Sequence, residues 1–404
     1  VKVDPRSEWK QMFREAVRIQ REYFYDPNHH GLDLAWLERH YGAWLPAVAS
    51  RQDLNYLISE ALGEVTVSHL GVGGGDVPQP RFVGVGLLGA DFELHQGRYR
   101  VTKVFTGESW NPGLRAPLSQ PGAQVATGEY LLAVNGQSLT AADSLFARMQ
   151  NTVGRQVTLT VGPNPDGTGS RELTVEPVGS ETALRHFDWI ESNRRWVDKA
   201  SNGRVGYVYM PDTANGGYTY FNRYFFAQVG KEGLIVDERW NGGGALATDI
   251  VELLKRPAMS FVATRDGVDE PQPQGAIHGP KVMLINESAG SGGDAMPYYF
   301  KKAGVGPLVG KRTWGGLVGR SMGVPLMDGG FVGTPTSGVW DPHNRTWIAE
   351  NIGVAPDVEV ELDPAAVRQG RDPQLEKGLA LVLEQLPKAT PAPVKRPDYP
   401  VYRR

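Results

Sequence analysis

Residues 282–296 read VMLINESAGSGGDAM. The apolar run that opens this segment predicts a buried strand, and residues 297–302 after it predict a helix. Ser291 therefore stands in a glycine-rich turn between a strand and a helix. Such a turn exposes a hydroxyl beside the free backbone N–H groups of the helix start. Acyl-transfer enzymes place a nucleophile in this position, although a capping serine in an ordinary turn explains the same residues.

The chain around this turn alternates strands and helices after Glu181. Apolar runs at 205–210, 233–237 and 281–285 predict strands, and periodic stretches near 217–229, 246–255 and 373–382 predict helices. This alternation is typical of an α/β fold.

The residues before Glu181 show two other sequence patterns, one helical and one of short strands and turns. Residues 7–62 predict three helices, of which the third begins near Asp53 as a plausible N-cap. From Phe82 to Gly179 the pattern favours short strands and turns. The predicted strands are 83–88, 99–104, 129–134 and 157–161, with a turn at Asn135-Gly136 and a helix over 141–146.

The composition excludes several classes of protein. The chain has 404 residues, a formal net charge of −3 and no cysteine. Nucleic acid is therefore an unexpected partner, and a thiol nucleophile, thiolate metal sites and disulfides are excluded. We find no apolar run that could span a bilayer.

The chain begins at Val1 without an initiator methionine or signal-peptide pattern, which suggests a piece of a longer protein. Residues 387–404 predict an extended or disordered tail.

Three further segments could supply chemistry to Ser291. His69 lies beside Ser68 in an otherwise apolar stretch and could act as a base or as a structural histidine. Residues 241–244 read Asn-Gly-Gly-Gly, which could donate backbone N–H groups to an oxyanion or form a flexible loop. Glu350 lies amid apolar residues and could orient the histidine, although most glutamates are simply solvated.

Taken together, these segments resemble the C-terminal half of the tricorn proteases, relatives of the C-terminal processing peptidases. The resemblance covers nearly the whole chain in order. Its motifs are Glu8-Trp9-Lys10, residues 20–27, Ser68-His69, residues 89–93, 241–244, 289–291, 310–316, 350–357 and 370–375.

The resemblance implies a role for each candidate residue. Ser291 matches the family's nucleophile, His69 its general base, and Ser68 the serine that completes a tetrad with the carboxylate of Glu350. The oxyanion donors would be the N–H groups of Gly244 and Gly292. Gly243 and Val262 are expected to contact substrate.

The family's architecture implies a multidomain α+β and α/β protein. Residues 1–77 would form a helical subdomain, 78–179 a PDZ-like domain and 180–387 a catalytic subdomain similar to the ClpP and crotonase fold, followed by the 388–404 tail. Relatives form hexamers, so we expect a cytoplasmic homo-oligomer that acts on peptides. No metal or organic cofactor, membrane or nucleic-acid partner is implied.

Two departures from related families sharpen these expectations. The C-terminal processing peptidases use a lysine base, but Gly316 stands at that position here and Lys311 is a poor substitute, which favours His69 as the base. The family's acidic P1-specificity residue aligns near Val262, with Asp266 out of register. We therefore predict an apolar or broad P1 preference.

The leading hypothesis is a tricorn-like serine endopeptidase that cleaves short or unfolded peptides through an acyl-enzyme. The main alternative is a catalytically silent PDZ scaffold that binds peptides on a degenerate peptidase fold. A third possibility is a different hydrolase, such as an esterase.

Overall fold

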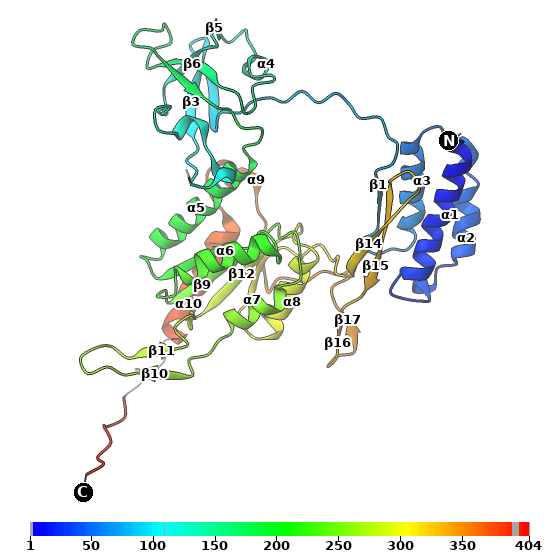
Figure 1. The fold of residues 1–404 in the computed structure, drawn as a ribbon. Helices are drawn as coiled ribbons and strands as arrows, with labels where there is room; N and C mark the ends of the chain where they lie inside the picture. Colours follow the sequence, from blue (N-terminus) through cyan, green and yellow to red (C-terminus); the bar gives the residue numbers. More distant parts are fainter. Residues whose placement is uncertain (1–2, 109, 390–395, 404) are drawn as a thin grey trace. The chain divides into compact units, whose positions relative to one another are not determined.

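The computed structural model describes residues 3–108, 110–389 and 396–403. The chain divides into two compact units, one made of residues 1–78 and 197–404 and the other of residues 79–196 (Figure 1). Helix α5 (Thr182–Ala200) crosses the boundary between them. Within the described residues, none of the helices combines the length and the apolar character of a membrane span.

The first unit begins with three helices that pack on a small antiparallel sheet. The helices are α1 (Pro5–Tyr23), α2 (Leu34–Gly42) and α3 (Arg51–Gly63). The sheet has the order β1-β15-β14, from β1 (Gly71–Gly73), β14 (Gly319–Pro325) and β15 (Phe331–Ser337). Leu326 and Val332 join the buried faces of the helices in one core. Because β1 starts two residues after His69, its pairing with β15 anchors that histidine to the sheet.

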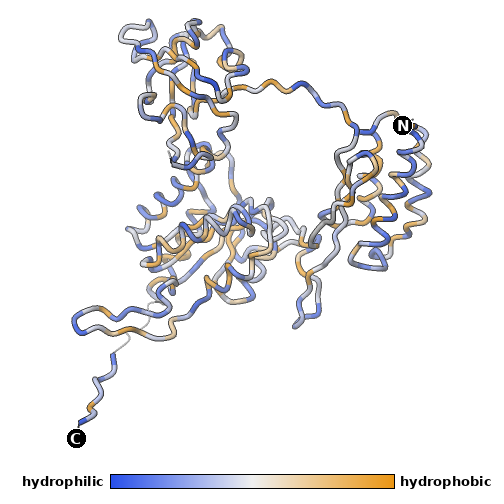
Figure 2. The backbone as a smooth tube through the Cα atoms, in the orientation of Figure 1, coloured by the Kyte–Doolittle hydropathy of each residue, from blue (hydrophilic) through white to orange (hydrophobic). Residues whose placement is uncertain are grey.

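The rest of the first unit is an α/β layer with a parallel sheet in the order β18-β13-β12-β9-β8. The orange trace of Figure 2 follows the apolar central strands. The strands are β8 (Val205–Tyr209), β9 (Gly233–Asp237), β12 (Lys281–Ile285), β13 (Leu308–Gly310) and β18 (Val358–Glu359). The helices are α6 (Asn215–Phe226), α7 (Ala247–Leu254), α8 (Gly292–Lys302), α9 (Pro364–Arg368) and α10 (Pro373–Ala389).

Two glycine-rich loops are neighbours because of this topology. Strands β9 and β12 pair in parallel, so their carboxyl ends meet at the same edge of the sheet. The loop at 241–244 follows β9, and the turn that contains Ser291 follows β12. The main-chain N–H of Gly290 donates to the carbonyl of Asn241 at 3.1 Å and joins the two loops directly.

Two hairpins extend the first unit. One pairs β10 (Ser260–Val262) with β11 (Glu270–Gln272), and the other pairs β16 (Trp340–Asp341) with β17 (Thr346–Trp347). The first of them projects from the α/β layer in Figure 1. Helix α10 continues to Ala389, so the tail predicted from residue 387 begins three residues too early. Residues 396–403 form neither helix nor strand, and residues 390–395 and 404 lie outside the described residues.

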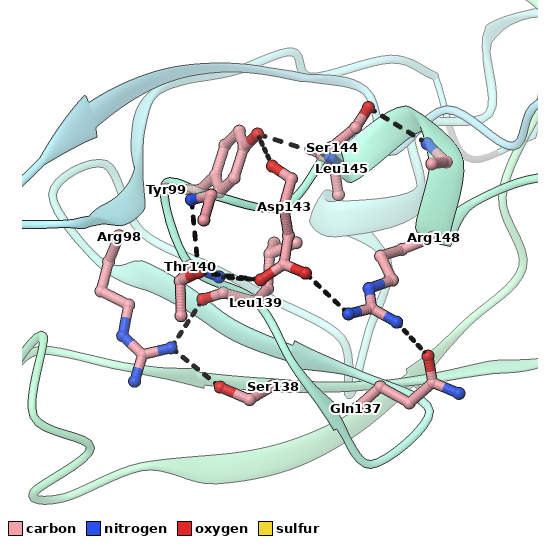
Figure 3. A network of polar contacts seen from close by, with 12 residues as sticks. Arg98, Tyr99, Gln137, Ser138, Leu139, Thr140, Asp143, Ser144, Leu145 and Arg148 are labelled. Carbon is pink, nitrogen blue, oxygen red and sulfur yellow. Dashed lines mark hydrogen bonds and ion pairs between the residues drawn. The ribbon is translucent and has the colours of Figure 1, made fainter.

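The second unit is an antiparallel sheet in the order β2-β3-β4-β6-β7, with β5 paired to β4. The strands are β2 (Ala90–His95), β3 (Arg98–Val104), β4 (Tyr130–Val134), β5 (Gln137–Ser138), β6 (Val157–Gly162) and β7 (Arg171–Val175), and a short helix α4 (Leu145–Arg148) follows β5. Figure 3 shows how polar contacts hold α4 near β3. Arg148 and Tyr99 both bond to Asp143, through its side chain at 2.7 Å and its carbonyl at 2.7 Å.

Most predicted elements are confirmed, including the strands β8, β9 and β12 and the helices α6, α7, α8 and α10. The strand predicted over 83–88 is wrong. Only Val85 and Leu87 form isolated bridges there, because they pair with two different segments, at Gln150 and Val178, and no continuous ladder develops.

Two helix starts are also corrected. Helix α4 begins at Leu145 rather than 141, after Ser144 as its N-cap. Asp53 is not the N-cap of α3. Ser50 caps that helix, and the carboxylate of Asp53 accepts the Ser50 N–H at 2.9 Å in a capping box.

Candidate active site

The turn between β12 and α8 holds Ser291 in an unusual backbone conformation. Its φ of +57° and ψ of −116° lie outside the regions that non-glycine residues prefer. Its N–H donates to the carbonyl of Gly316 at 2.9 Å and to the carboxylate of Asp294 at 3.0 Å. A Cβ on Gly292 would stand 1.9 Å from the hydroxyl of Thr213, so only glycine fits beside the serine.

The structure brings Ser291, His69, Ser68 and Glu350 into one chain of contacts. Ser291 Oγ lies 3.1 Å from His69 Nε2. His69 Nδ1 lies 2.7 Å from Ser68 Oγ, which in turn lies 3.2 Å from Glu350 Oε2. All four residues belong to the first unit, although 282 positions separate Ser68 from Glu350 in the chain.

The carboxylate of Glu350 decides which group donates and which accepts in each of these hydrogen bonds. An ionised carboxylate only accepts hydrogen bonds, so Ser68 must donate its proton to Glu350. The Ser68 oxygen then accepts from His69 Nδ1–H, which leaves the lone pair of Nε2 free to face Ser291. His69 is thereby held in the tautomer that a general base for Ser291 requires.

Glu350 fixes the position of the Ser68-His69 segment. Besides the Ser68 hydroxyl, its carboxylate accepts the N–H of Ser68 at 2.6 Å, of Leu317 at 2.5 Å and of Val318 at 2.8 Å. The neighbouring Asn351 side chain donates to the carbonyl of Thr66 at 2.7 Å. Residues 350–351 therefore bind the chain at Ser68 and just before it, at Thr66.

The loop after β9 lies directly against Ser291. A Cβ on Gly243 would stand 2.6 Å from the Cβ of Ser291, and the Gly243 N–H already donates to Asn241 Oδ1 at 2.9 Å. Gly244 has a φ of +137°, and its nitrogen lies 2.7 Å from where a Cβ on Gly292 would stand. Within the described residues, neither the N–H of Gly244 nor that of Gly292 has a hydrogen-bond acceptor. These two groups are therefore available to an oxyanion.

Sequence reasoning missed Asp294, whose carboxylate holds the Ser291 turn and the 313–316 segment together by hydrogen bonds. It is fully buried and accepts hydrogen bonds from the N–H groups of Ser291, Gly315 and Gly316 and from the hydroxyl of Thr313. Burial raises the pKa of the Asp294 carboxyl, whereas these hydrogen bonds act in the opposite direction. The Ser-x-x-Asp spacing at a helix start is the signal that could have identified it.

Sequence reasoning also missed Glu238, the residue after β9. Its side chain is completely buried, and within the described residues neither carboxyl oxygen has a hydrogen-bond partner. Burial raises the pKa of Glu238 well above its ordinary value, and the neighbouring Asp294 and Asp237 raise it further. A neutral, protonated Glu238 is the form that this environment favours.

Two other residues singled out in the sequence lie elsewhere. Val262 is about half exposed on the β10–β11 hairpin, and the contacts of the described residues do not bring it to Ser291. Lys311 forms ion pairs with Glu359 at 2.7 Å and Glu361 at 3.1 Å, rather than with Ser291 or its neighbours. Within the described part of the chain, no group of three or more His, Asp or Glu side chains could hold a metal ion.

Comparison with known proteins gives three family matches along the chain. Residues 5–63 match the tricorn protease C1 domain, residues 86–180 the tricorn protease PDZ domain, and residues 204–360 peptidase family S41.

Individual relatives agree with these matches. Tricorn protease homolog 1 of Streptomyces coelicolor is 37% identical over 395 residues, which cover 96% of this chain and 37% of that protein. The tricorn protease homolog of Saccharolobus solfataricus is 34% identical, with 96% and 36% covered. The crystal structure of the tricorn protease superposes with a TM-score of 0.88 at 30% identity, over 95% of this chain and 37% of the other. The chain thus spans well under half the length of these relatives. It carries, in order, the C1, PDZ and S41 peptidase domains of the tricorn proteases.

Proposed function

We propose that this chain is a serine endopeptidase that hydrolyses short or unfolded peptides through a Ser-His-Ser-Glu tetrad and an acyl-enzyme. The observation that carries the proposal is the continuous path of contacts from Ser291 through His69 and Ser68 to Glu350, with each step at 3.2 Å or less. Chain segments so far apart in sequence have no local reason to converge on this arrangement.

Each residue has a defined role in the proposed reaction. His69 Nε2 takes the proton of Ser291 as the oxygen attacks the scissile carbonyl carbon, and the carbonyl oxygen becomes an oxyanion. The N–H groups of Gly244 and Gly292 stabilise that negative charge. His69 then gives its proton to the leaving amine as the C–N bond breaks. A water molecule, deprotonated by His69, hydrolyses the ester and regenerates Ser291.

Ser68 and Glu350 act on the histidine rather than on the peptide. When His69 gains a proton it becomes a cation. The Ser68 hydroxyl lies between this cation and the Glu350 carboxylate, so the carboxylate stabilises the positive charge through the hydroxyl. A carboxylate that acts through a hydroxyl stabilises the imidazolium less than one in direct contact. We therefore assign Ser68 and Glu350 as positioning residues.

The wider organisation belongs to the same proposal. Residues 1–77 would be a helical subdomain that carries the base, 78–179 a PDZ-like domain, 180–387 the catalytic subdomain, and 388–404 a tail. Support for the subdomain division comes from the tricorn C1, tricorn PDZ and S41 matches at 5–63, 86–180 and 204–360. A cytoplasmic hexamer, an apolar or broad P1 preference and substrate contacts at Gly243 and Val262 complete it.

Covalent labelling tests the proposal directly. The protein is incubated with a fluorophosphonate, and its intact mass is compared with that of Ser291→Ala and His69→Ala. We expect one adduct on the wild type and none on Ser291→Ala. For His69→Ala we expect labelling at least about 10³-fold slower, in line with losses measured in other triads.

Two outcomes would redirect the proposal. A loss of less than about tenfold in His69→Ala would assign the base to another group. An unlabelled wild type that still binds peptides would favour the catalytically silent PDZ scaffold. Peptide and ester substrates compared side by side would distinguish a peptidase from an esterase.

A further inference from the structure

Trp314 lies beside the nucleophile and has no role in the tetrad. Its N–H donates to the carbonyl of Ala289 at 2.9 Å, and two residues later the carbonyl of Gly316 accepts the N–H of Ser291 at 2.9 Å. Residues 314–316 therefore run alongside the nucleophile turn and are fixed to it at both ends. The backbone position of Trp314 relative to Ser291 is set by these two hydrogen bonds.

One edge of the indole ring, at Cε3 and Cζ3, packs closely against two glycines. A Cβ on Gly290 would stand 2.5 Å from the ring, and a Cβ on Gly316 would stand 2.3 Å from it. Real Cβ atoms do not approach so closely, so the ring occupies the space that side chains at 290 and 316 would need. Yet 59% of the Trp314 surface remains exposed. The site thus presents a large aromatic surface to solvent whose orientation is constrained by packing.

Trp314 lies next to His69, the residue that protonates the leaving amine in the proposed mechanism. Its ring centroid lies 6.4 Å from that of His69. In the proposed mechanism His69 protonates the leaving amine, so the residue that carries this amine must pass next to the imidazole. The oxyanion donors Gly244 and Gly292 define the other side, where the acyl group lies. The exposed indole surface is therefore next to the first residue after the scissile bond, P1′.

We infer that Trp314 forms the wall of an S1′ subsite that selects peptides with a large apolar or aromatic residue after the scissile bond. This inference rests on the proposed function, because it requires an acyl-enzyme on Ser291. An apolar side chain stacked on the indole would remove surface from water on both partners. A glycine at P1′ would leave the ring exposed.

Partitioning of the acyl-enzyme isolates this subsite from every other one. The enzyme is acylated with the p-nitrophenyl ester of N-acetyl-leucine, which has no P1′ residue, in the presence of phenylalaninamide or glycinamide. The amine attacks the Ser291 ester carbon, the C–N bond forms, the C–O bond to Ser291 breaks, and the serine recovers its proton through His69. The ratio of amide to acid product measures how well each amine binds at S1′.

We expect phenylalaninamide to capture the acyl group about tenfold better than glycinamide, as fits the partial burial of one aromatic side chain. In Trp314→Ala the preference should fall to about twofold or less, and Trp314→Phe should retain an intermediate preference. Trp44→Ala is the matched control, because Trp44 is 62% exposed in the helical region and makes no contact with the tetrad.

A purely structural role for Trp314 would slow the capture of both amines together and leave their ratio unchanged. An unchanged ratio in Trp314→Ala, or no preference in the wild type, would overturn the inference while leaving the peptidase proposal intact. Absence of nitrophenol release that depends on Ser291 would instead remove the proposed function, and the inference with it.

Discussion

One carboxylate organises each half of the candidate site, and each accepts four hydrogen bonds. On the Ser291 side, Asp294 accepts from Ser291, Thr313, Gly315 and Gly316. On the His69 side, Glu350 accepts twice from Ser68 and once each from Leu317 and Val318. The two carboxylates therefore bind consecutive stretches of the same segment, 313–318, and this segment joins the two halves.

The two carboxylates differ in how far along the chain they act. Asp294 lies three residues from Ser291 in the first turn of α8 and is fully buried. Glu350 lies 282 residues from Ser68 and is half-buried. Ser291 is thus positioned by a local helix start, whereas His69 is positioned only when distant segments meet. Loss of Glu350 should separate His69 from Ser291, and loss of Asp294 should destabilise the fold around both.

Among the substitutions of these carboxylates, Glu350→Gln should have the largest effect on catalysis. The amide keeps the size of the side chain, but its NH₂ group would face an N–H or O–H donor. We expect kcat/KM to fall by about 10² to 10³, less than for a carboxylate that contacts the histidine directly. The measurement is steady-state peptide hydrolysis together with the thermal unfolding midpoint.

Glu361→Gln is the control for that prediction, because Glu361 is 65% exposed and pairs only with Lys311 among the described residues. It should behave as the wild type. A loss of less than about fivefold in Glu350→Gln would mean that the rest of the first unit, including the β1–β15 pairing, holds His69 in place without the carboxylate.

Asp294→Asn should act mainly on stability. One of the two oxygens becomes an NH₂ group that cannot accept from two of the four donors, and three of these donors belong to the buried residues Thr313, Gly315 and Gly316. We expect the free energy of unfolding to fall by about 2 to 4 kcal/mol, with a loss of fluorophosphonate labelling as the Ser291 turn relaxes. Chemical denaturation measures the first effect, and the labelling rate measures the second.

The control for Asp294→Asn is Asp249→Asn, which changes an exposed aspartate in the first turn of α7. There we expect a change below about 1 kcal/mol. Equal effects at the two positions would show that the network around Asp294 adds nothing beyond the usual helix-start interaction.

The smallest expected effect is a pH-dependent change in the free energy of unfolding that involves the buried residue Glu238. The charges of Asp294 on α8 and of its neighbour Asp237 act on Glu238, and Glu238 acts in turn on Tyr209 on β8. The folded-state pKa of Glu238 lies above the ordinary value of 4.5, so the native state holds the proton more tightly than the unfolded state. Its contribution to stability is therefore fully present below that value and declines as pH rises toward the folded pKa.

Glu238→Gln keeps the shape of the protonated acid and removes the titration. We expect it to be more stable than the wild type by about 1 to 3 kcal/mol at about pH 8, and to match the wild type at about pH 4.5. Denaturant unfolding at several pH values tests this. Glu252→Gln, at a 66% exposed site, should show no such divergence. A parallel pH profile for Glu238→Gln and the wild type would mean that Glu238 is ionised in the fold.

The sequence by itself determined the parts of this protein that depend on neighbouring residues. The nucleophile turn, the strands β8, β9 and β12 and the helices around them follow from apolar runs, periodicity and turn residues. The resemblance of ordered motifs identified Ser291, His69, Ser68 and Glu350 as one set. The three-residue spacing of Asp294 from Ser291 is also a feature of the sequence.

Only the tertiary structure decided how these parts meet. Residues 83–88 have strand-like composition but bond to two separate segments, so no strand forms. Three features depend on segments from different regions of the chain. They are the contact of Ser68 with Glu350, the packing of Trp314 against Gly290 and Gly316, and the burial of Glu238. Such contacts depend on how the sheet and helices pack in three dimensions, and local propensity carries no information about that packing.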